Sequence, residues 1–246
     1  MGYRTGFFPL AEKHYYIIVE KVPESIQEEM KSKTDMLLYD MYANPTLDDG
    51  LYYSQINKAF KIKYSDEFIN FVNQTLIKYE AEVREYHNIN LKGIDLDKLE
   101  TNTNLNSPFN HGPNSGFVTL QQRFEFQHPH MGEELFNFKY FGRVPYTRGS
   151  EKNCMPNPKA GKHHVGTDYF VAGAVKETNH PSNPEGNLVP RIRPQIYELP
   201  TSDLYEGALC IYPPYLLRAS TPFYSTKEYK VVYEGQLGFR KASTLI

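Results

Sequence analysis

The sequence contains no tryptophan and only two cysteines among its 246 residues. Cys154 and Cys210 are far apart, and neither lies in a CxxC pair or in a Cys/His cluster. Structural zinc sites need such clusters, so a zinc site of this kind is disfavoured. The cysteine usage is typical of a protein from a reducing compartment.

Long apolar runs and a strong net charge are also absent. No segment approaches the ~20 consecutive apolar residues of a membrane-spanning helix, and residues 1–22 lack the continuous apolar segment of a signal peptide. The formal net charge of −2 gives no strong field that would attract nucleic acid or an acidic membrane. We therefore expect a protein that is not secreted by a signal peptide, does not span a membrane and binds neither of these partners.

The other aromatic residues are abundant, with 20 Tyr and 15 Phe. Aromatic side chains are favoured on pleated, half-buried sheet surfaces, so this content indicates β structure. The tyrosines either pack between elements with wet hydroxyl groups or form a contact surface for another protein, since interfaces are enriched in tyrosine. The composition leaves both interpretations open.

The first third of the chain predicts one strand and two helices. Tyr15–Glu20 reads as a strand, and Pro23 is well placed to open a helix over residues 24–42. A clearer helix is predicted over 65–87, and Ser65 can cap its N-terminus. Its apolar residues recur every three or four positions, at Phe68, Val72, Leu76, Tyr79 and Val83. This spacing predicts a helix that lies on a sheet.

The rest of the chain predicts strands. Residues 89–116 are rich in Asn, Gly and Pro and predict a long connection or arm. Short strands separated by turn signals favour a sandwich or jelly roll over alternating βαβ units. The predicted fold class is α+β, mainly β, with a double-stranded β-helix (jelly-roll) domain over 117–246 and residues 1–88 packed on it. Its strands are predicted at 117–126, 135–141, 169–175 and 196–199, and as two strands within 206–239.

Histidines are the main candidates for chemistry, because the chain has eight of them and no GxSxG, GxxxxGK[ST] or HExxH motif. A non-haem iron site takes two His and one carboxylate on one face of the metal. His128 and His130, just after a predicted strand, have the i, i+2 spacing that points two ligands to the same side. His164 is followed by Asp168 on the approach to the strand at 169–175. These four residues are candidate metal ligands, with a loop or surface role as the alternative for each histidine.

The C-terminal segment carries a more specific pattern. It contains EGALCIYPP over residues 206–214 and, after a polar loop, EYKVV over 228–232. These residues resemble the end of the 2-oxoglutarate/Fe(II) oxygenase-like jelly-roll proteins, particularly those frequent in marine bacteria and their tailed phages. Upstream, residues 164–173 (HVGTDYFVAG) resemble the family's H-x-[HD]-P segment and the strand after it. The resemblance implies a double-stranded β-helix.

The resemblance also implies site residues. At several of these positions, this chain carries a different side chain from the one typical of the resembled proteins. The second metal ligand falls on Gly166, which has no side chain, and the distal ligand falls on Leu217 or Arg218. Arginine is cationic at any ordinary pH and cannot ligate iron. The family's 2-oxoglutarate-binding arginine falls on Tyr229 or Lys230, of which Lys230 can still pair with a carboxylate. Only the first histidine ligand is matched, which implies a degenerate metal site.

Three functions are compatible with this pattern. The preferred one is a non-catalytic oxygenase-like jelly roll that serves as a structural or assembly module, in its most concrete form a head, neck or tail component of a phage virion. Its partners would be protein subunits, its location the cytoplasm or the virion, and no cofactor is expected. The first alternative is an Fe(II)/2-oxoglutarate-dependent hydroxylase with ligands rearranged among His128, His130, His164 and Asp168. The second is a metal-free, cupin-like binder of a sugar or small ligand.

Overall fold

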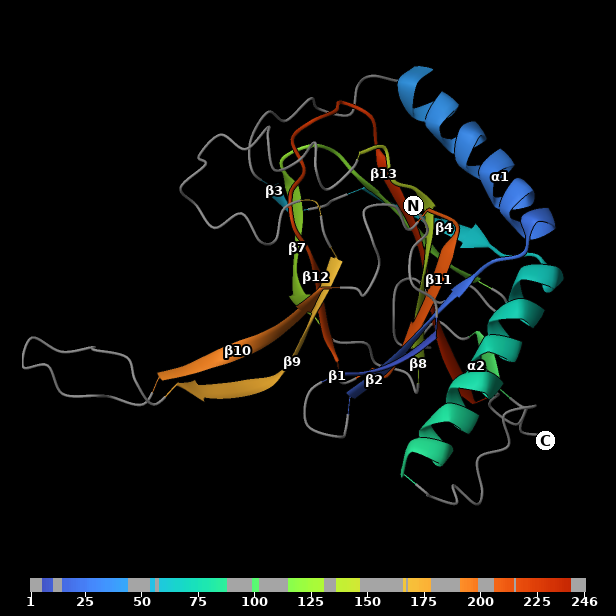
Figure 1. Ribbon diagram of the computed structural model, residues 1–246. Helices are drawn as coiled ribbons and strands as arrows, with labels where there is room; N and C mark the ends of the chain where they lie inside the picture. The colour runs from blue at the N-terminus through green and yellow to red at the C-terminus, as the bar shows by residue number, and fades with distance from the viewer. Residues whose placement is uncertain are drawn as a thin grey trace, which may run out of the picture.

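The computed structural model describes residues 6–10, 15–43, 54–55, 58–87, 99–101, 115–130, 136–146, 166, 168–177, 191–198, 206–214 and 216–239. Within these ranges the chain forms two β-sheets and two α-helices (Figure 1). The predicted α+β, mainly β fold class is confirmed at this level.

The larger sheet has eight strands in the order β1-β2-β11-β8-β13-β6-β4, with β5 paired to β13. All of its pairs are antiparallel. Its strands are β1 (Gly6–Leu10), β2 (Tyr15–Lys21), β4 (Lys58–Lys63), β5 (Leu99–Thr101), β6 (Ser115–Gln121), β8 (Phe136–Arg143), β11 (Ala208–Tyr212) and β13 (Lys230–Phe239). Since β13 pairs with β6, β8 and β5, it lies in the interior of the sheet.

The smaller sheet has five strands in the order β10-β9-β12-β7-β3. Only β3 pairs in parallel, with β7; the other pairs are antiparallel. The strands are β3 (Ser54–Gln55), β7 (Glu125–His130), β9 (Asp168–Glu177), β10 (Arg191–Glu198) and β12 (Leu217–Ser220). From β6 onward the chain therefore moves back and forth between the two sheets.

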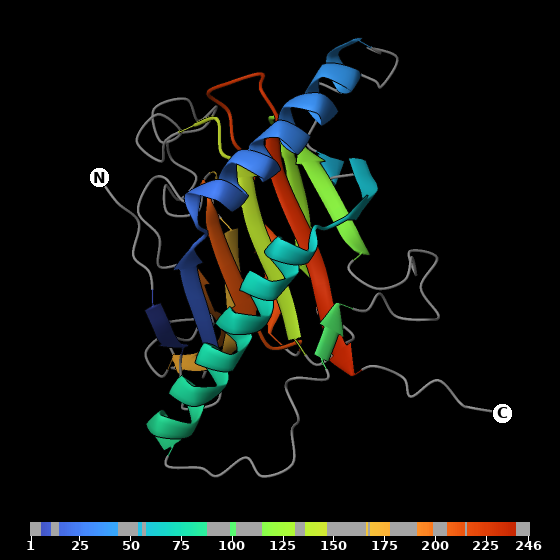
Figure 2. The same ribbon diagram turned by 90° about the vertical axis from the view of Figure 1, so that its right-hand side faces the viewer.

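Both helices cover the same face of the larger sheet (Figure 2). They are α1 (Glu24–Ala43) and α2 (Asp66–His87), close to the predicted ranges. The Ser65 hydroxyl accepts a hydrogen bond from the Phe68 N–H at 3.2 Å and so caps α2, as predicted. The predicted apolar stripe of α2 packs on the sheet.

Two apolar cores lie on the two faces of the larger sheet, because successive residues of a strand point to opposite faces. In β8, Phe138 and Tyr140 pack in the core under the helices, whereas Phe141 packs in the core between the sheets. In β13, Tyr233 points to the helices and Val232 to the other sheet. Both strands are thus covered by an apolar core on each face.

The predicted single strand at 117–126 is wrong, because this stretch contains parts of two strands in different sheets, β6 and β7. The turn between them holds Phe124 at a φ of 70°, which is uncommon for a non-glycine residue. The Phe124 N–H donates to the Phe223 carbonyl at 3.0 Å and helps to hold this turn. A local sequence pattern gives no sign of that distant contact.

The prediction of two strands within 206–239 is also wrong, because the segment contains three. β11 and β13 do not pair with each other, since β8 lies between them. The chain between β11 and β13 crosses to the smaller sheet and forms β12, which is only four residues long. A strand this short cannot display the period-two pattern by which strands are recognised.

Several strands arise where the sequence pattern predicts none. These include β1 and β4, as well as β5, which falls inside the predicted connection at 89–116. β10 begins at Arg191, several residues before the strand predicted at 196–199. The strands predicted at 15–20, 135–141 and 169–175 are confirmed as β2, β8 and β9.

None of the helices in the described ranges combines the length and the apolarity that a membrane crossing requires.

Candidate functional site

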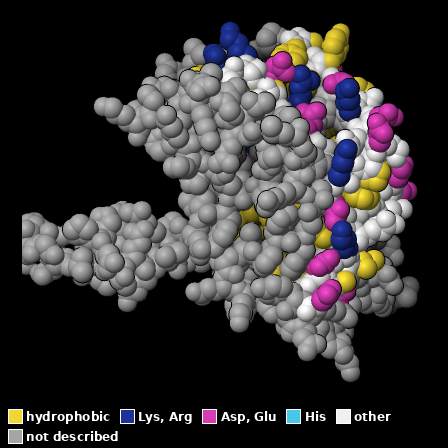
Figure 3. Space-filling model, in the orientation of Figure 1, with side chains coloured by type: hydrophobic (Ala, Val, Ile, Leu, Met, Phe, Trp, Pro, Cys, Tyr) yellow, Lys and Arg dark blue, Asp and Glu magenta, His cyan; other side chains and the backbone are white. Residues whose placement is uncertain are grey.

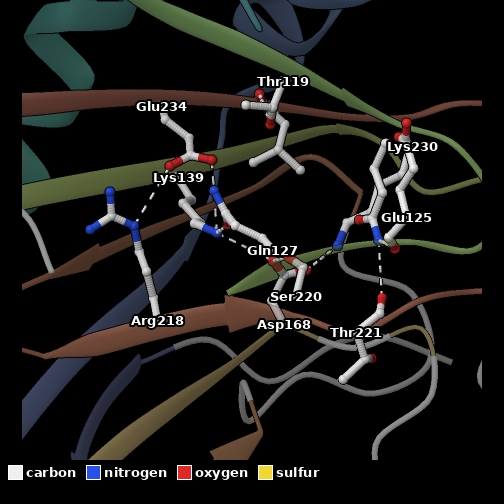
Figure 4. A network of polar contacts seen from close by, with 12 residues as sticks. Thr119, Glu125, Gln127, Lys139, Asp168, Arg218, Ser220, Thr221, Lys230 and Glu234 are labelled. Carbon is white, nitrogen blue, oxygen red and sulfur yellow. Dashed lines mark hydrogen bonds and ion pairs between the residues drawn. The ribbon is translucent and has the colours of Figure 1, made fainter. Parts of the chain in front are cut away.

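The candidate site is a group of charged side chains buried between the two sheets (Figure 4). Asp168, the first residue of β9, and Lys230, the first residue of β13, are at its centre. The ionisable residues are almost fully buried, with exposed fractions of 0% for Lys230, 2% for Lys139, 2% for Glu234, 3% for Asp168 and 4% for Arg218. Charged side chains are rarely buried to this degree unless they are paired.

Asp168 accepts hydrogen bonds on both carboxylate oxygens. The Lys230 ammonium donates to Oδ2, and the Ser220 hydroxyl donates to Oδ1. Lys139 Nζ also donates to Oδ1, over 3.3 Å. The donors come from β13, β12 and β8, so this one carboxylate connects the two sheets.

The charged neighbours determine the protonation of Asp168. Burial by itself raises the pKa of this carboxyl. The charges of Lys230 and Lys139, together with the hydrogen bonds from Lys230 and Ser220, outweigh burial and hold the pKa well below its usual range. Burial lowers the pKa of Lys230, while the Asp168 carboxylate opposes that change. Asp168 is therefore a carboxylate at neutral pH.

The group continues through Lys139 to Glu234 and Arg218. Lys139 Nζ lies 3.8 Å from Glu234 Oε1 and donates a hydrogen bond to Gln127 Oε1 over 3.5 Å. Arg218 Nε lies 3.7 Å from Glu234 Oε2. Figure 4 shows the terminal nitrogens of Arg218 pointing away from the other residues of the group. When all these residues are ionised, the cations outnumber the anions by one.

A further set of polar contacts fixes the strands around the group. Gln121 Nε2 donates to the carbonyls of Glu125 and Thr221, at 2.7 and 3.0 Å. The Gln122 N–H donates to the Glu125 carboxylate at 2.7 Å. Burial raises the pKa of Glu125, against the opposing effects of the Gln122 hydrogen bond and the charge of Lys58. These contacts hold β6, β7 and the segment after β12 together.

Aromatic and sulfur side chains of the inter-sheet core border the charged group. The Lys230 ammonium lies 5.8 Å from the centroid of the Phe141 ring, and the Arg218 guanidinium lies 5.4 Å from that of Tyr212. Ring faces attract cations, which offsets part of the cost of their burial. Cys210 is a buried free thiol, and burial raises its pKa. It is therefore neutral and not a reactive thiolate.

The register brings together two of the positions discussed as metal ligands. His128 and His130 lie within β7, not after a strand as predicted, and the backbone of His130 is the register partner of Arg218 in β12. The resemblance implies the distal ligand at Arg218 or Leu217. The side chains of both histidines, and all of His164, lie outside the described residues.

The described residues do not fit the iron that the resemblance implies. Gly166 lies in the left-handed region with a φ of 64°, and its N–H donates to the Pro222 carbonyl at 2.8 Å. Asp168 directs both oxygens at protein donors, and Arg218 brings a fixed positive charge. Among the described residues, no group of three or more His, Cys, Asp or Glu side chains could hold a metal ion.

The described residues do not fit 2-oxoglutarate either. Lys230, the implied partner of its carboxylate, donates to Asp168 and has no exposed surface. Tyr229, the other aligned position, is buried, and its hydroxyl accepts hydrogen bonds from Gln122 at 2.6 Å and from Lys58 at 3.4 Å. A carboxylate of the chain itself already neutralises the lysine that would bind this acid.

Sequence reasoning singled out Asp168, Lys230 and Arg218 but missed Lys139, Glu234 and Ser220. The run LFNFKYF alternates, so Lys139 is expected on a polar face, and in a half-covered sheet that face is exposed to water. Glu234 is likewise expected on a polar face that is exposed to water. The smaller sheet covers this face, so both charged side chains are buried. The local sequence pattern does not indicate that a second sheet packs there.

Comparisons with known proteins give only a distant similarity of fold. No protein-family model matches the sequence, and no curated protein matches it significantly. Among solved structures, the fold is similar to the crystal structure of a prolyl-4-hydroxylase from Pseudomonas putida, with a TM-score of 0.43 and 7% sequence identity. The alignment covers 92% of this chain and 93% of that chain. A likeness of this degree says nothing about activity.

Proposed function

We propose that the chain is a double-stranded β-helix protein of the 2-oxoglutarate/Fe(II) oxygenase type that does not catalyse the oxygenase reaction and acts as a structural or assembly module. The strand order supports the fold. β6, β8, β11 and β13 belong to one sheet, whereas β7, β9, β10 and β12 belong to the other. A chain that alternates between two packed antiparallel sheets is typical of jelly rolls.

The observation that carries the loss of catalysis is the pairing of Lys230 with Asp168. Both groups are buried, and Lys139 and Ser220 bind the same carboxylate. To bind 2-oxoglutarate at Lys230, the chain would have to separate Lys230 from Asp168 and leave this buried carboxylate without its lysine partner. Leaving one member of a buried pair without its partner costs about 3–5 kcal/mol.

Arg218 supports the same conclusion from the metal side. Its guanidinium lies within the inter-sheet group, beside Glu234, at a position where the resemblance implies a ligand. A permanent cation there opposes the binding of a divalent metal. The alternative hydroxylase with rearranged ligands would have to rely on His128, His130 and His164 without Asp168.

An exposed apolar stripe supports a role in assembly. Met36, Tyr39 and Tyr42 are spaced by three residues along α1, and their exposed fractions are 70%, 74% and 55%. Figure 3 shows hydrophobic side chains among mixed charges on the helix-covered side of the molecule. We assign this stripe to contact with other protein subunits, with a tailed-phage virion as the concrete setting that the resemblance suggests.

A turnover assay tests the loss of catalysis. Purified protein is supplied with Fe(II), oxygen and 2-oxoglutarate, and succinate is measured. We expect no succinate above the background of the same mixture without protein. Succinate release that disappears in His130→Ala or in His164→Ala would contradict the proposal and favour the hydroxylase.

Light scattering tests the assembly role. We expect the purified chain to self-associate as its concentration rises, and Tyr39→Lys to weaken this association. Ile77→Lys on α2 is the matched control, because Ile77 is an isolated exposed apolar residue. A wild-type chain that stays monomeric, or an equal effect of both variants, would argue against the stripe.

A further inference from the structure

Several buried polar atoms between the sheets have no hydrogen-bond partner. They include both amide atoms of Asn137, the hydroxyl of Tyr212, Nε and Nη1 of Arg218, and Oε2 of Glu234. Such orphans are uncommon in folded proteins, and each costs about 1–3 kcal/mol when nothing satisfies it. A cluster of them marks a place where a ligand or an ordered water would supply the missing hydrogen bonds.

These residues are close neighbours. Tyr212 of β11 is the register partner of Asn137 of β8, and residues in register on antiparallel strands lie on the same face. The Arg218 guanidinium lies 5.4 Å from the centroid of the Tyr212 ring. Glu234 Oε2 lies 3.7 Å from Arg218 Nε. The four residues thus come from four strands of the two sheets and meet at one place.

The charges of the site favour an anion. Lys230, Lys139 and Arg218 face only Asp168 and Glu234 within the group. A buried charge without a counter-charge is unfavourable, so the excess cation favours an anionic occupant. The planar guanidinium fork of arginine matches a carboxylate best.

We propose that Arg218, Asn137 and Tyr212 bind a small carboxylate that carries a hydroxyl group, without a metal. Arg218 Nη1 and the Asn137 amide donate to the carboxylate. The ligand hydroxyl donates to Glu234 Oε2, the orphan acceptor, and accepts from the Tyr212 hydroxyl. This site is separate from the Lys230 ammonium that Asp168 neutralises, and it does not depend on the proposed lack of turnover.

The test uses the full chain with EDTA present and glycolate as the probe. Isothermal titration calorimetry measures the affinity at constant ionic strength, with acetate and ethylene glycol as comparisons. Acetate lacks the hydroxyl, and ethylene glycol lacks the charge. We expect saturable binding of glycolate, about tenfold weaker binding of acetate, and no binding of ethylene glycol.

Tyr212→Phe is the decisive variant, because it removes only the orphan hydroxyl and keeps the ring. We expect it to weaken glycolate binding about tenfold while leaving the unliganded protein at least as stable as the wild type. Tyr233→Phe is the matched control. It removes a hydroxyl from the helix-facing side of β13, where the group is hydrogen-bonded to Thr34, and it leaves the glycolate affinity unchanged.

The proposal is overturned if glycolate does not bind, if ethylene glycol binds as well as glycolate, or if Tyr212→Phe leaves the affinity unchanged. Arg218→Lys is a second test variant, because lysine keeps the positive charge beside Glu234 but lacks the planar guanidinium group. We expect it to weaken binding at least tenfold, and an unchanged affinity would also overturn the proposal. Because EDTA removes iron, the outcome is independent of the succinate assay.

Discussion

The two faces of the larger sheet are built from the same strands, and both carry an apolar core, but only the face toward the smaller sheet also holds a buried ionic group. Towards the helices, β8 and β13 present Phe138 and Tyr233 among apolar neighbours. Towards the smaller sheet, the adjacent positions present Lys139 and Glu234, which are buried to the same extent. One residue along a strand separates an apolar core from a buried ionic group.

The difference indicates what each face does. Burial of apolar surface stabilises the fold by about 25 cal/mol per Å², so the helix-facing core accounts for much of the stability. A buried ion pair adds little net stability, because the loss of hydration offsets the attraction between the charges. The ionic face therefore points to specificity or ligand binding, and variants on the two faces should behave differently.

The largest effect is expected from Asp168→Asn. The substitution keeps the shape of the side chain but leaves Lys230 and Lys139 without their shared carboxylate. We expect the free energy of unfolding, measured by urea denaturation, to fall by about 3–5 kcal/mol. Glu228→Gln is the control, because the exposed Arg143–Glu228 pair should contribute less than about 1 kcal/mol. Similar losses in both variants would contradict a special role for the buried pair.

At low pH, we expect part of the stability difference between the wild type and Asp168→Asn to disappear. The pKa of Asp168 is lowered in the folded chain, so its contribution is fully present above the unfolded pKa of about 3.9 and is lost as the pH falls through the lower folded value. We expect the stability gap between wild type and Asp168→Asn to be constant from about pH 5 to 7 and to shrink below about pH 4. Urea denaturation at a series of pH values measures this gap. A gap that grows on acidification would contradict the assignment.

The same contrast explains what the sequence could predict. The helix-facing side follows local rules: the spacing of Phe68 and Val72 in α2 and the cap at Ser65 are enough to find a helix on a sheet. The inter-sheet face depends on contacts between distant segments. Lys139 and Glu234 are buried only because the smaller sheet covers them, and no local pattern contains that information.

Individual residues of the candidate site could be predicted where the residue type at that one position was informative. Asp168 was a candidate because it follows His164, and Lys230 because the resemblance implies a 2-oxoglutarate-binding residue there. The pairing of Lys230 with a carboxylate was expected, although not with this one. Ser220 was missed because β12 is too short to be recognised as a strand. The turn at Phe124 was missed for a related reason, since a contact far along the chain holds it.

A much smaller effect than that of Asp168→Asn is expected from Tyr233→Phe on the helix-facing side. The hydroxyls of Tyr233 and Thr34 share a hydrogen bond of 2.8 Å, and burial raises the pKa of Tyr233 to about 12, so the group is neutral. The Thr34 hydroxyl also donates to the Met30 carbonyl at 2.7 Å, so the substitution leaves no buried donor without an acceptor. We therefore expect urea denaturation to show a loss of only about 1 kcal/mol, without pH dependence between about pH 3 and 8. A loss as large as that of Asp168→Asn would mean that neutral and charged contacts matter equally, and the contrast between the two faces would not hold.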